Sequence, residues 1–161
     1  MAFNLQTFTL FHVLVSLAGI ITGLVVAGGL AGGKRLTNWA GVFMITTLAT
    51  SVTGFGFPVD ALLPSHIVGI ITLVVLAVVL VAHVKQLAGP WRRVYASGVV
   101  AATYLNSFVL VVQLFRRVPD LETLAPTQSE PPFAITQLLV LASFIWLAVA
   151  ANAGTRSTVA R

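Results

Sequence analysis

The chain has no cysteine and very few charged residues. Without cysteine it can form no disulfide and has no catalytic thiol or thiolate metal ligand. Only 8% of its 161 residues are charged, whereas a soluble domain carries about 25%. Because 58% of the residues are hydrophobic, we predict that lipid surrounds most of the chain. The length suits one transmembrane domain over residues 1–161.

Several common catalytic patterns are also missing. None of the four acidic residues lies inside a long apolar segment, so no buried carboxylate is available to drive a proton pump or to orient a histidine in a Ser-His-Asp triad. The glycine-rich stretches do not have the GxGxxG or GxxxxGK[ST] spacing of nucleotide-binding loops, and there is no HExxH zinc motif. The sequence therefore assigns no reaction and no catalytic residue.

Five apolar segments have the length of a membrane-spanning helix, which is about 20 residues. The first lacks a basic leader and has basic residues after it, so we expect a retained span and not a cleaved signal peptide. The second is the least apolar because it carries five Thr and Ser residues between positions 46 and 53. We predict an all-α, integral membrane five-helix transmembrane bundle, with spans over about 5–30, 38–57, 65–87, 93–115 and 131–152.

The charged residues divide between the two sides of this predicted bundle. All four acidic residues fall on one side, with Arg116 and Arg117, whereas the other seven basic residues fall on the opposite side. Those seven are Lys34, Arg35, Lys85, Arg92, Arg93, Arg156 and Arg161. Because positive charge marks the cytoplasmic side, we predict an outer N-terminus and a cytoplasmic C-terminus. Anionic lipid headgroups, and not nucleic acid, are then the expected partners of the basic residues.

Two histidines fall in the outer half of the predicted bundle. His12 lies in the first span, and His66 opens the third span on the same side. The first span also carries a face of small residues that favours close helix packing: Ser16, Gly19, Gly23 and Ala27. If the first and third helices touch, His12 and His66 are candidates to share a metal ion or to bracket a haem. The alternative is that each histidine only hydrogen-bonds a neighbouring helix.

The fourth span carries a line of polar residues on one helix side. The line consists of Thr103, Asn106, Gln113 and Arg117. Gln137 enters the fifth span from the same, outer side of the membrane. Such residues either form hydrogen bonds between helices or line a hydrophilic cavity that opens outward.

The loop before the fifth span is rich in proline and contains Glu130. We expect it either to fold over the outer end of the bundle as a lid or to be a solvated connection. In the first case Arg117 and Glu130 close the mouth of the cavity.

Four segments resemble a family of small, uncharacterised bacterial inner-membrane proteins. They are TGFGFP (53–58), PSHIVG (64–69), YLNSFVLVVQ (104–113) and LAPTQSEPPF (124–133). The resemblance covers most of the chain and implies a location in the bacterial inner membrane. It implies no activity and no catalytic residue.

Together these patterns predict a polar ligand- or cofactor-binding pocket in the outer half of the bundle. The candidate ligands are a quinone-like molecule, a haem or a metal, and neutral amides and imidazoles suit a carbonyl-bearing ligand. The candidate residues are His12, His66, Asn106, Gln113, Arg117, Glu130 and Gln137. Two other interpretations stay open. The chain is either an accessory or assembly subunit with a membrane-protein partner or a second copy of itself, or a small carrier or permeation unit.

Overall fold

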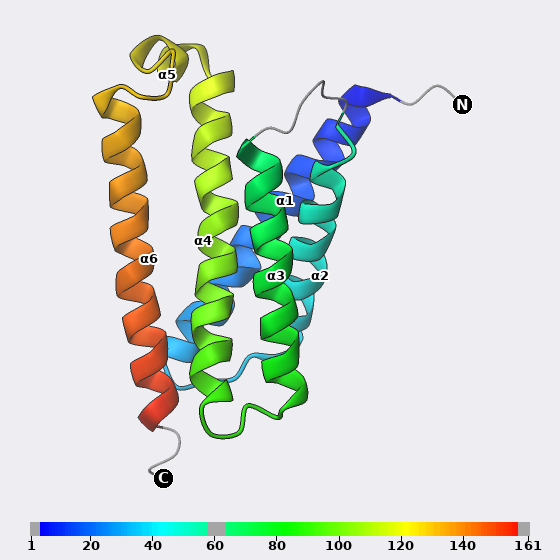
Figure 1. Cartoon of the computed structure of the whole chain (residues 1–161), viewed down its shortest axis with the longest axis vertical. Coiled ribbons are helices and arrows are strands. Elements are labelled where there is room, and N and C mark those ends of the chain that lie inside the picture. The colour runs from blue at the N-terminus through cyan, green and yellow to red at the C-terminus, as the bar shows by residue number, and fades with distance from the viewer. Residues whose placement is uncertain (1–3, 58–63, 158–161) are drawn as a thin grey trace.

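The computed structural model describes residues 4–57 and 64–157, and Asp60 and Arg161 lie outside them. Within this part the chain forms six helices. They are α1 (Leu5–Ala31), α2 (Thr37–Gly54), α3 (Pro64–Val84), α4 (Trp91–Arg117), α5 (Pro119–Leu124) and α6 (Pro131–Ser157). The five long helices run alternately up and down, so the two chain termini lie at opposite ends of the bundle (Figure 1). The prediction of an all-α protein is confirmed.

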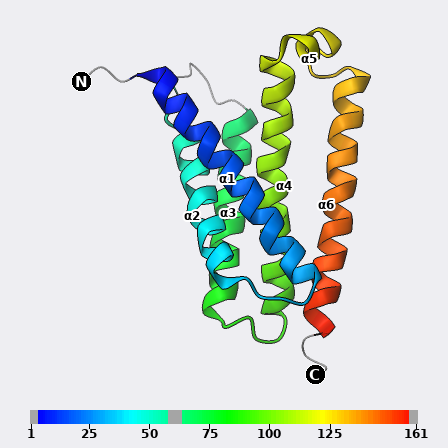
Figure 2. The ribbon, with the colours of Figure 1, turned by 180° about the vertical axis from the view of Figure 1, so that it is seen from behind.

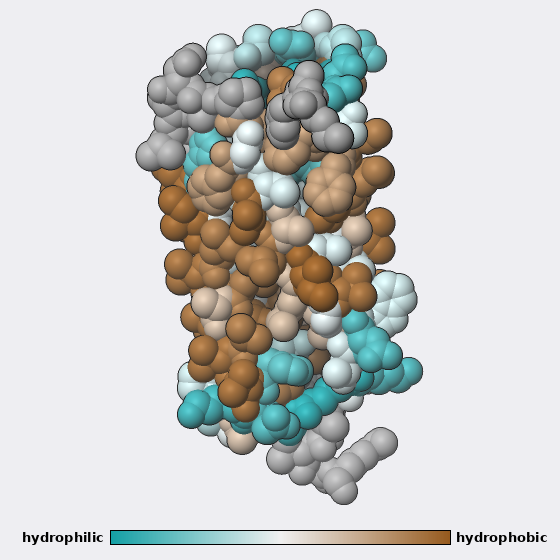
Figure 3. All heavy atoms as spheres, turned by 90° about the vertical axis from the view of Figure 1, so that its right-hand side faces the viewer, coloured by the Kyte–Doolittle hydropathy of each residue, from teal (hydrophilic) through white to brown (hydrophobic). Residues whose placement is uncertain are grey.

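Four of the helices, α1, α3, α4 and α6, are long and apolar enough to cross a membrane. A helix of 27 residues such as α1 is about 40 Å long, which exceeds the ~30 Å hydrocarbon core of a bilayer. Figure 3 shows a broad hydrophobic band between two hydrophilic ends. The protein is therefore a multi-pass integral membrane protein. By length and composition α2 falls short, so this measure supports four of the five predicted spans.

The threonines and serine that make α2 less apolar face the inside of the bundle. Thr47, Thr50 and Ser51 are only 0%, 7% and 6% exposed. The outward side of α2 carries large apolar residues instead: Val42, Ile45, Leu48 and Val52. A helix with polar residues inside and apolar residues outside is suited to a lipid environment.

α1 crosses the bundle diagonally, as Figure 2 shows, and packs on α2, α4 and α6. The predicted face of small residues lies in these contacts, because Gly19, Gly23 and Ala27 are all buried. A Cβ atom on Gly23 would lie 2.2 Å from Thr103 Oγ1 and 2.9 Å from Phe43 Cε2. Glycine at this position therefore allows α1 to approach α2 and α4 closely.

The backbones of α1 and α6 meet where both helices end. A Cβ atom on Gly154 would lie 2.2 Å from the carbonyl oxygen of Leu30 and 2.4 Å from that of Ala31. Only a residue without a side chain fits at this crossing, so Gly154 sets how closely α6 approaches α1.

The two ends of the bundle carry different charges, and we name them accordingly. The basic end contains the turns after α1 and α3, with Lys34, Arg35, Lys85, Arg92 and Arg93. The acidic end contains α5 and the loop before α6, with Asp120, Glu122 and Glu130, and also Arg116 and Arg117 at the end of α4. Each of these charged residues thus lies at the end of the bundle to which the sequence assigned it.

The loop at the acidic end folds back over α4 and α6 and contains the short helix α5 (Figure 1). Ala125, 1% exposed, packs with Val111 and Phe115 of α4 in a small apolar cluster. α5 was not predicted, although Pro119 opens it and Asp120 lies in its first turn, which are typical features of a helix start. The loop is an ordered cap on α4 and α6, and it does not extend over α1 and α2.

Candidate functional site

His12 is held by the C-terminal turn of α2. Its Nδ1 lies 2.8 Å from Thr53 Oγ1, and its ring meets Phe57 edge-on with centroids 5.1 Å apart. The Thr53 hydroxyl has one hydrogen, which it donates to the carbonyl oxygen of Ala49 at 2.7 Å. Thr53 Oγ1 therefore accepts from His12 Nδ1, and this tautomer leaves Nε2 with a free lone pair.

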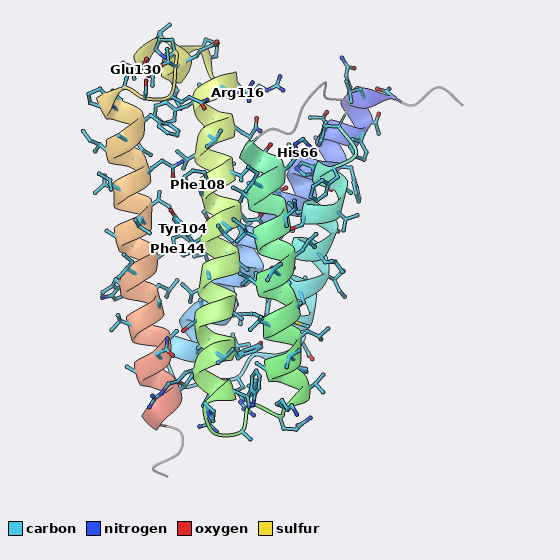
Figure 4. The ribbon with its side chains drawn as sticks, viewed as in Figure 1. His66, Tyr104, Phe108, Arg116, Glu130 and Phe144 are labelled. Carbon is cyan, nitrogen blue, oxygen red and sulfur yellow. The ribbon has the colours of Figure 1, made fainter. Side chains whose placement is uncertain are left out.

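His66 is buried on the other side of the same segment. It is 5% exposed and stacks on Phe55 with ring centroids 5.5 Å apart and planes 30° from parallel. Figure 4 shows His66 near the start of α3. The TGFGF segment thus supplies a different aromatic ring to each histidine, Phe57 to His12 and Phe55 to His66.

His12 and His66 can share a ligand only if α1 and α3 touch. In the part of the chain that the structure describes, α1 packs on α2, α4 and α6, and α2 packs on both α1 and α3, but α1 and α3 make no extensive contact. Among the same residues no group of three or more His, Cys, Asp or Glu side chains comes together as a metal site. A haem or metal on His12 and His66 stays a prediction without geometric support.

The polar residues of α2 and α4 meet beside Gly19 in the middle of the bundle. A Cβ atom on Gly19 would lie 3.3 Å from both Asn106 Nδ2 and Thr47 Oγ1, and 3.5 Å from Thr46 Oγ1. Within residues 4–57 and 64–157, the buried atoms Asn106 Nδ2, Thr47 Oγ1 and Thr50 Oγ1 have no hydrogen-bond partner. We call Thr47, Thr50 and Asn106 the polar core. It is the strongest candidate site in the half of the bundle nearer the acidic end.

The polar line predicted on the fourth span does not continue through the interior. Thr103 is 0% exposed and Asn106 is half-buried, but Gln113 and Arg117 are exposed. The reason is the diagonal course of α1, which lies away from α4 toward the acidic end (Figure 2). No neighbouring helix covers this side of α4 at Gln113 and Arg117, so these two residues do not line a closed cavity with Asn106.

Amide side chains join α4 to α6 and to the loop before it. Gln137 Nε2 donates to the carbonyl oxygen of Phe108 at 3.2 Å, and its Oε1 is buried without a partner among the described residues. Gln128 Nε2 donates to the carbonyl oxygen of Val112 at 3.4 Å, and Asn152 Nδ2 donates to Ser97 Oγ at 3.0 Å. Gln137 thus serves the helix contact, and sequence patterns had not singled out Gln128 or Asn152.

Aromatic rings fill the space beside Gln137. Tyr104 packs between Phe108 and Phe144, with ring centroids 6.3 Å and 5.7 Å away, and all three lie between α4 and α6 in Figure 4. Aromatic pairs at such distances stabilise a helix contact, so this region is a packed interface and not an open pocket.

Glu130 stabilises its own loop. Its carboxylate accepts hydrogen bonds from Thr127 N at 3.1 Å, Thr127 Oγ1 at 2.8 Å and Ser129 N at 3.1 Å. Desolvation acts to raise the pKa of Glu130, but these hydrogen bonds outweigh it and hold the pKa below its usual value. Across the described residues no ion pair joins Glu130 to Arg117, and Arg116 points away from Glu130 in Figure 4. The expected closure of a mouth by Arg117 and Glu130 has no support in this arrangement.

Two hollows lie at the basic end, away from His12 and His66. The larger, of about 70 Å³, is lined by Arg35, Thr37, His83, Gln86 and Tyr95 together with apolar residues. A smaller one of about 20 Å³ adjoins it. Pockets for drug-sized ligands have about 300–1,000 Å³, so neither hollow accommodates a haem or a whole quinone ring system.

No known protein family, curated protein or solved structure matches this chain. The resemblance of its four segments to small bacterial inner-membrane proteins therefore stays a prediction.

Proposed function

We propose that the half of the bundle nearer the acidic end binds the head of a small carbonyl-bearing membrane ligand, such as a quinone-like molecule. Asn106 is the main donor in this proposal. The observation that carries it is the buried Asn106 Nδ2, which has no acceptor in the described part of the chain. A buried donor without a partner costs about 1–3 kcal/mol. A ligand oxygen at Asn106 removes this cost.

Thr47 and Thr50 extend the set of donors. Other threonines of the bundle donate to a carbonyl oxygen one turn earlier, as Thr46 does to Val42 at 2.7 Å and Thr103 does to Val99 at 2.8 Å. The hydroxyls of Thr47 and Thr50 make no such bond to a described residue, so their hydrogens remain for another acceptor. Three donors in an apolar surrounding favour a neutral ligand that carries oxygen acceptors.

His12 is the second polar group of the proposed site. It lies seven residues before Gly19 on α1, which is about 10 Å nearer the acidic end. With its proton on Nδ1, its Nε2 accepts a hydrogen bond from a hydroxyl group. A quinone-like ligand changes between a carbonyl and a hydroxyl form. Its carbonyl form accepts hydrogen bonds from the polar core, and its hydroxyl form donates to His12 Nε2.

The ligand is tested by purifying the protein in mild detergent and extracting it with organic solvent. We expect a carbonyl-bearing molecule in near-stoichiometric amount, reduced at least about tenfold in Asn106→Leu because the donor is lost. Gln113→Leu is the matched control, since Gln113 is an exposed amide on the same helix. An empty extract, with no visible absorption band and no metal, excludes the proposal.

We infer that α2 also crosses the membrane, which makes five spans in all, with the N-terminus outside and the C-terminus in the cytoplasm. Its 18 residues reach about 27 Å, and its inward polar face and outward apolar face support a position across the bilayer. The gathering of basic residues at one end supports the orientation. A reporter fused to the C-terminus is expected to be active only in the cytoplasm, and activity outside excludes this topology.

A second candidate function is that of a subunit in a larger membrane complex, and it is favoured by α6. None of the residues in the most apolar window of α6 is buried, and Trp146, near the middle of the helix, is 71% exposed. Tryptophan is more common at membrane interfaces than at mid-depth. If the protein is such a subunit, we expect a stoichiometric partner to co-purify with it in mild detergent. A homogeneous monomer excludes this function.

A further inference from the structure

The hollow at the basic end is surrounded by positive charge that none of the described acidic side chains neutralises. Lys34, Arg35 and Arg92 line the two adjoining hollows, which share Arg35 and Tyr95. The three described acidic residues all lie at the opposite end, beyond the length of the bundle. Within the described residues these cations therefore have no carboxylate partner, and an external anion is the available counter-charge.

The Tyr95 hydroxyl is available as a donor at the same place. Tyr95 is 5% exposed and lines both hollows together with Arg35. Its ring packs beside His83 with centroids 6.3 Å apart. In the part of the chain that the structure covers, the hydroxyl has no hydrogen-bond partner, although buried tyrosines usually find one.

The backbone around the hollow favours an anion as well. Thr37, the first residue of α2, lines the larger hollow, and no side chain caps this helix start. Several carbonyl oxygens at the nearby helix ends already accept hydrogen bonds. Gly28 and Leu30 of α1 accept from Gly32 and Gly33, and Thr155 of α6 accepts from Arg92 Nη1 at 3.2 Å. The uncapped start of α2 therefore lies beside the hollow, and a helix start suits a negatively charged group.

We propose that this hollow binds the phosphate group of an anionic membrane lipid between Arg35, the Tyr95 hydroxyl and the start of α2. The volume of about 70 Å³ is large enough for a phosphate group, and the rest of the lipid remains outside. A lipid is the expected source because the hollow lies at the helix ends, where headgroups lie. Lys34 and Arg92 contribute charge from the adjoining hollow.

The proposal is tested by native mass spectrometry of the full chain from nanodiscs of phosphatidylcholine containing phosphatidylglycerol. We expect one retained phosphatidylglycerol per protein. Its apparent affinity should fall about tenfold in Arg35→Gln and several-fold in Tyr95→Phe. Lys85→Gln and Arg93→Gln are matched controls, since they remove the same charge at the same end but line neither hollow. Both are expected to retain the lipid within about twofold of the wild type.

An equal loss in Lys85→Gln or Arg93→Gln overturns the proposal, because general surface charge then explains the binding. An unchanged affinity in Tyr95→Phe overturns it too, and this variant should fold normally because the hydroxyl has no internal partner. A parallel titration uses inorganic phosphate on protein in phosphatidylcholine alone. Saturable binding there that is lost in Arg35→Gln overturns the lipid as the source, whereas no binding there supports it.

Discussion

The two halves of the bundle have different interiors, although the same helices run through both. Toward the basic end the core is apolar, with Val26, Phe43, Val79 and Val99 each at most 2% exposed. Toward the acidic end the same helices enclose Thr47, Thr50 and Asn106, three of whose polar atoms have no partner among the described residues. One half has the packing that membrane helices need for stability, whereas the other contains polar groups that add no stability unless something binds them.

Charged residues and neutral polar residues also lie in different parts of the bundle. The uncompensated cations surround a hollow at the end of the apolar half, whereas the neutral polar residues lie inside the other half. A charged ligand and a neutral ligand are therefore expected at different depths. Substitutions in each half test whether this division is real.

The largest effect is expected from a substitution in the apolar half, at the crossing of α1 and α6. Gly154→Ala places a Cβ atom 2.2 Å from the carbonyl oxygen of Leu30, and backbone cannot move aside as a side chain can. We expect a loss of about 3 kcal/mol or more in the free energy of unfolding, measured by thermal or denaturant unfolding in detergent. Gly28→Ala on α1 is the control, because nothing lies within 4 Å of its added atom. Equal stability of the two variants contradicts the crossing.

A smaller loss is expected at the boundary between the halves. Gly23→Ala brings a Cβ atom to 2.2 Å from Thr103 Oγ1 and 2.9 Å from Phe43, so we expect about 1–3 kcal/mol of destabilisation. Thr103→Ala in the same chain removes one of the two clashing groups. A double-mutant cycle on Gly23→Ala and Thr103→Ala should therefore show partial rescue. Strictly additive losses would mean that α1 and α4 do not meet at this position.

Two threonines of α2 differ in their hydrogen bonding, since Thr53 has a partner in His12 and Thr47 has none among the described residues. Thr53→Val removes the hydroxyl that holds His12 Nδ1 at 2.8 Å and should destabilise the protein by about 0.6–1 kcal/mol. Thr47→Val removes a buried hydroxyl without a partner among the described residues, so the ligand-free protein should be equally stable or more stable. Both are read from unfolding of extracted, ligand-free protein. If Thr47→Val is the more damaging change, the polar core is already satisfied.

The smallest effect concerns the cap at the acidic end and depends on pH. Hydrogen bonds from Thr127 and Ser129 hold the pKa of Glu130 below its usual value despite desolvation. The stabilisation is therefore complete above the unfolded-state pKa of about 4.3 and is lost as the pH falls through the lower folded-state pKa. Hydrogen exchange at Thr127 and Ser129, corrected for the intrinsic effect of pH, should rise on acidification. Glu130→Gln should remove this dependence, and an unaltered pH profile would refute the assignment to Glu130.

Much of the secondary structure could be predicted because hydrophobic runs and helix-stopping residues are local signals. The expected start of the fifth span at 131 coincides with α6 (Pro131–Ser157), and the expected first span ends one residue before α1 does. The small-residue face of α1 was also predictable, since spacing alone places Gly19, Gly23 and Ala27 together. The short helix α5 was missed because a search for long apolar runs ignores six polar-rich residues.

The site was predicted less well because helix spacing does not give helix tilt. Gln113 and Arg117 share a side of α4 with Asn106, but the diagonal course of α1 leaves them exposed. The hollow around Tyr95 has no local pattern at all, since its lining comes from the ends of α1, α2, α3 and α4.

The sequence alone determined that this is a helical membrane protein with opposite charge at its two ends. It could do so because hydrophobicity, helix length and the sign of each end depend only on residues close together in the chain. The tertiary structure decided which polar residues face one another. Thr47 and Asn106 both approach Gly19, and Arg35 and Tyr95 line one hollow beside the start of α2, because the crossing angles and close approaches of separate helices bring distant segments together.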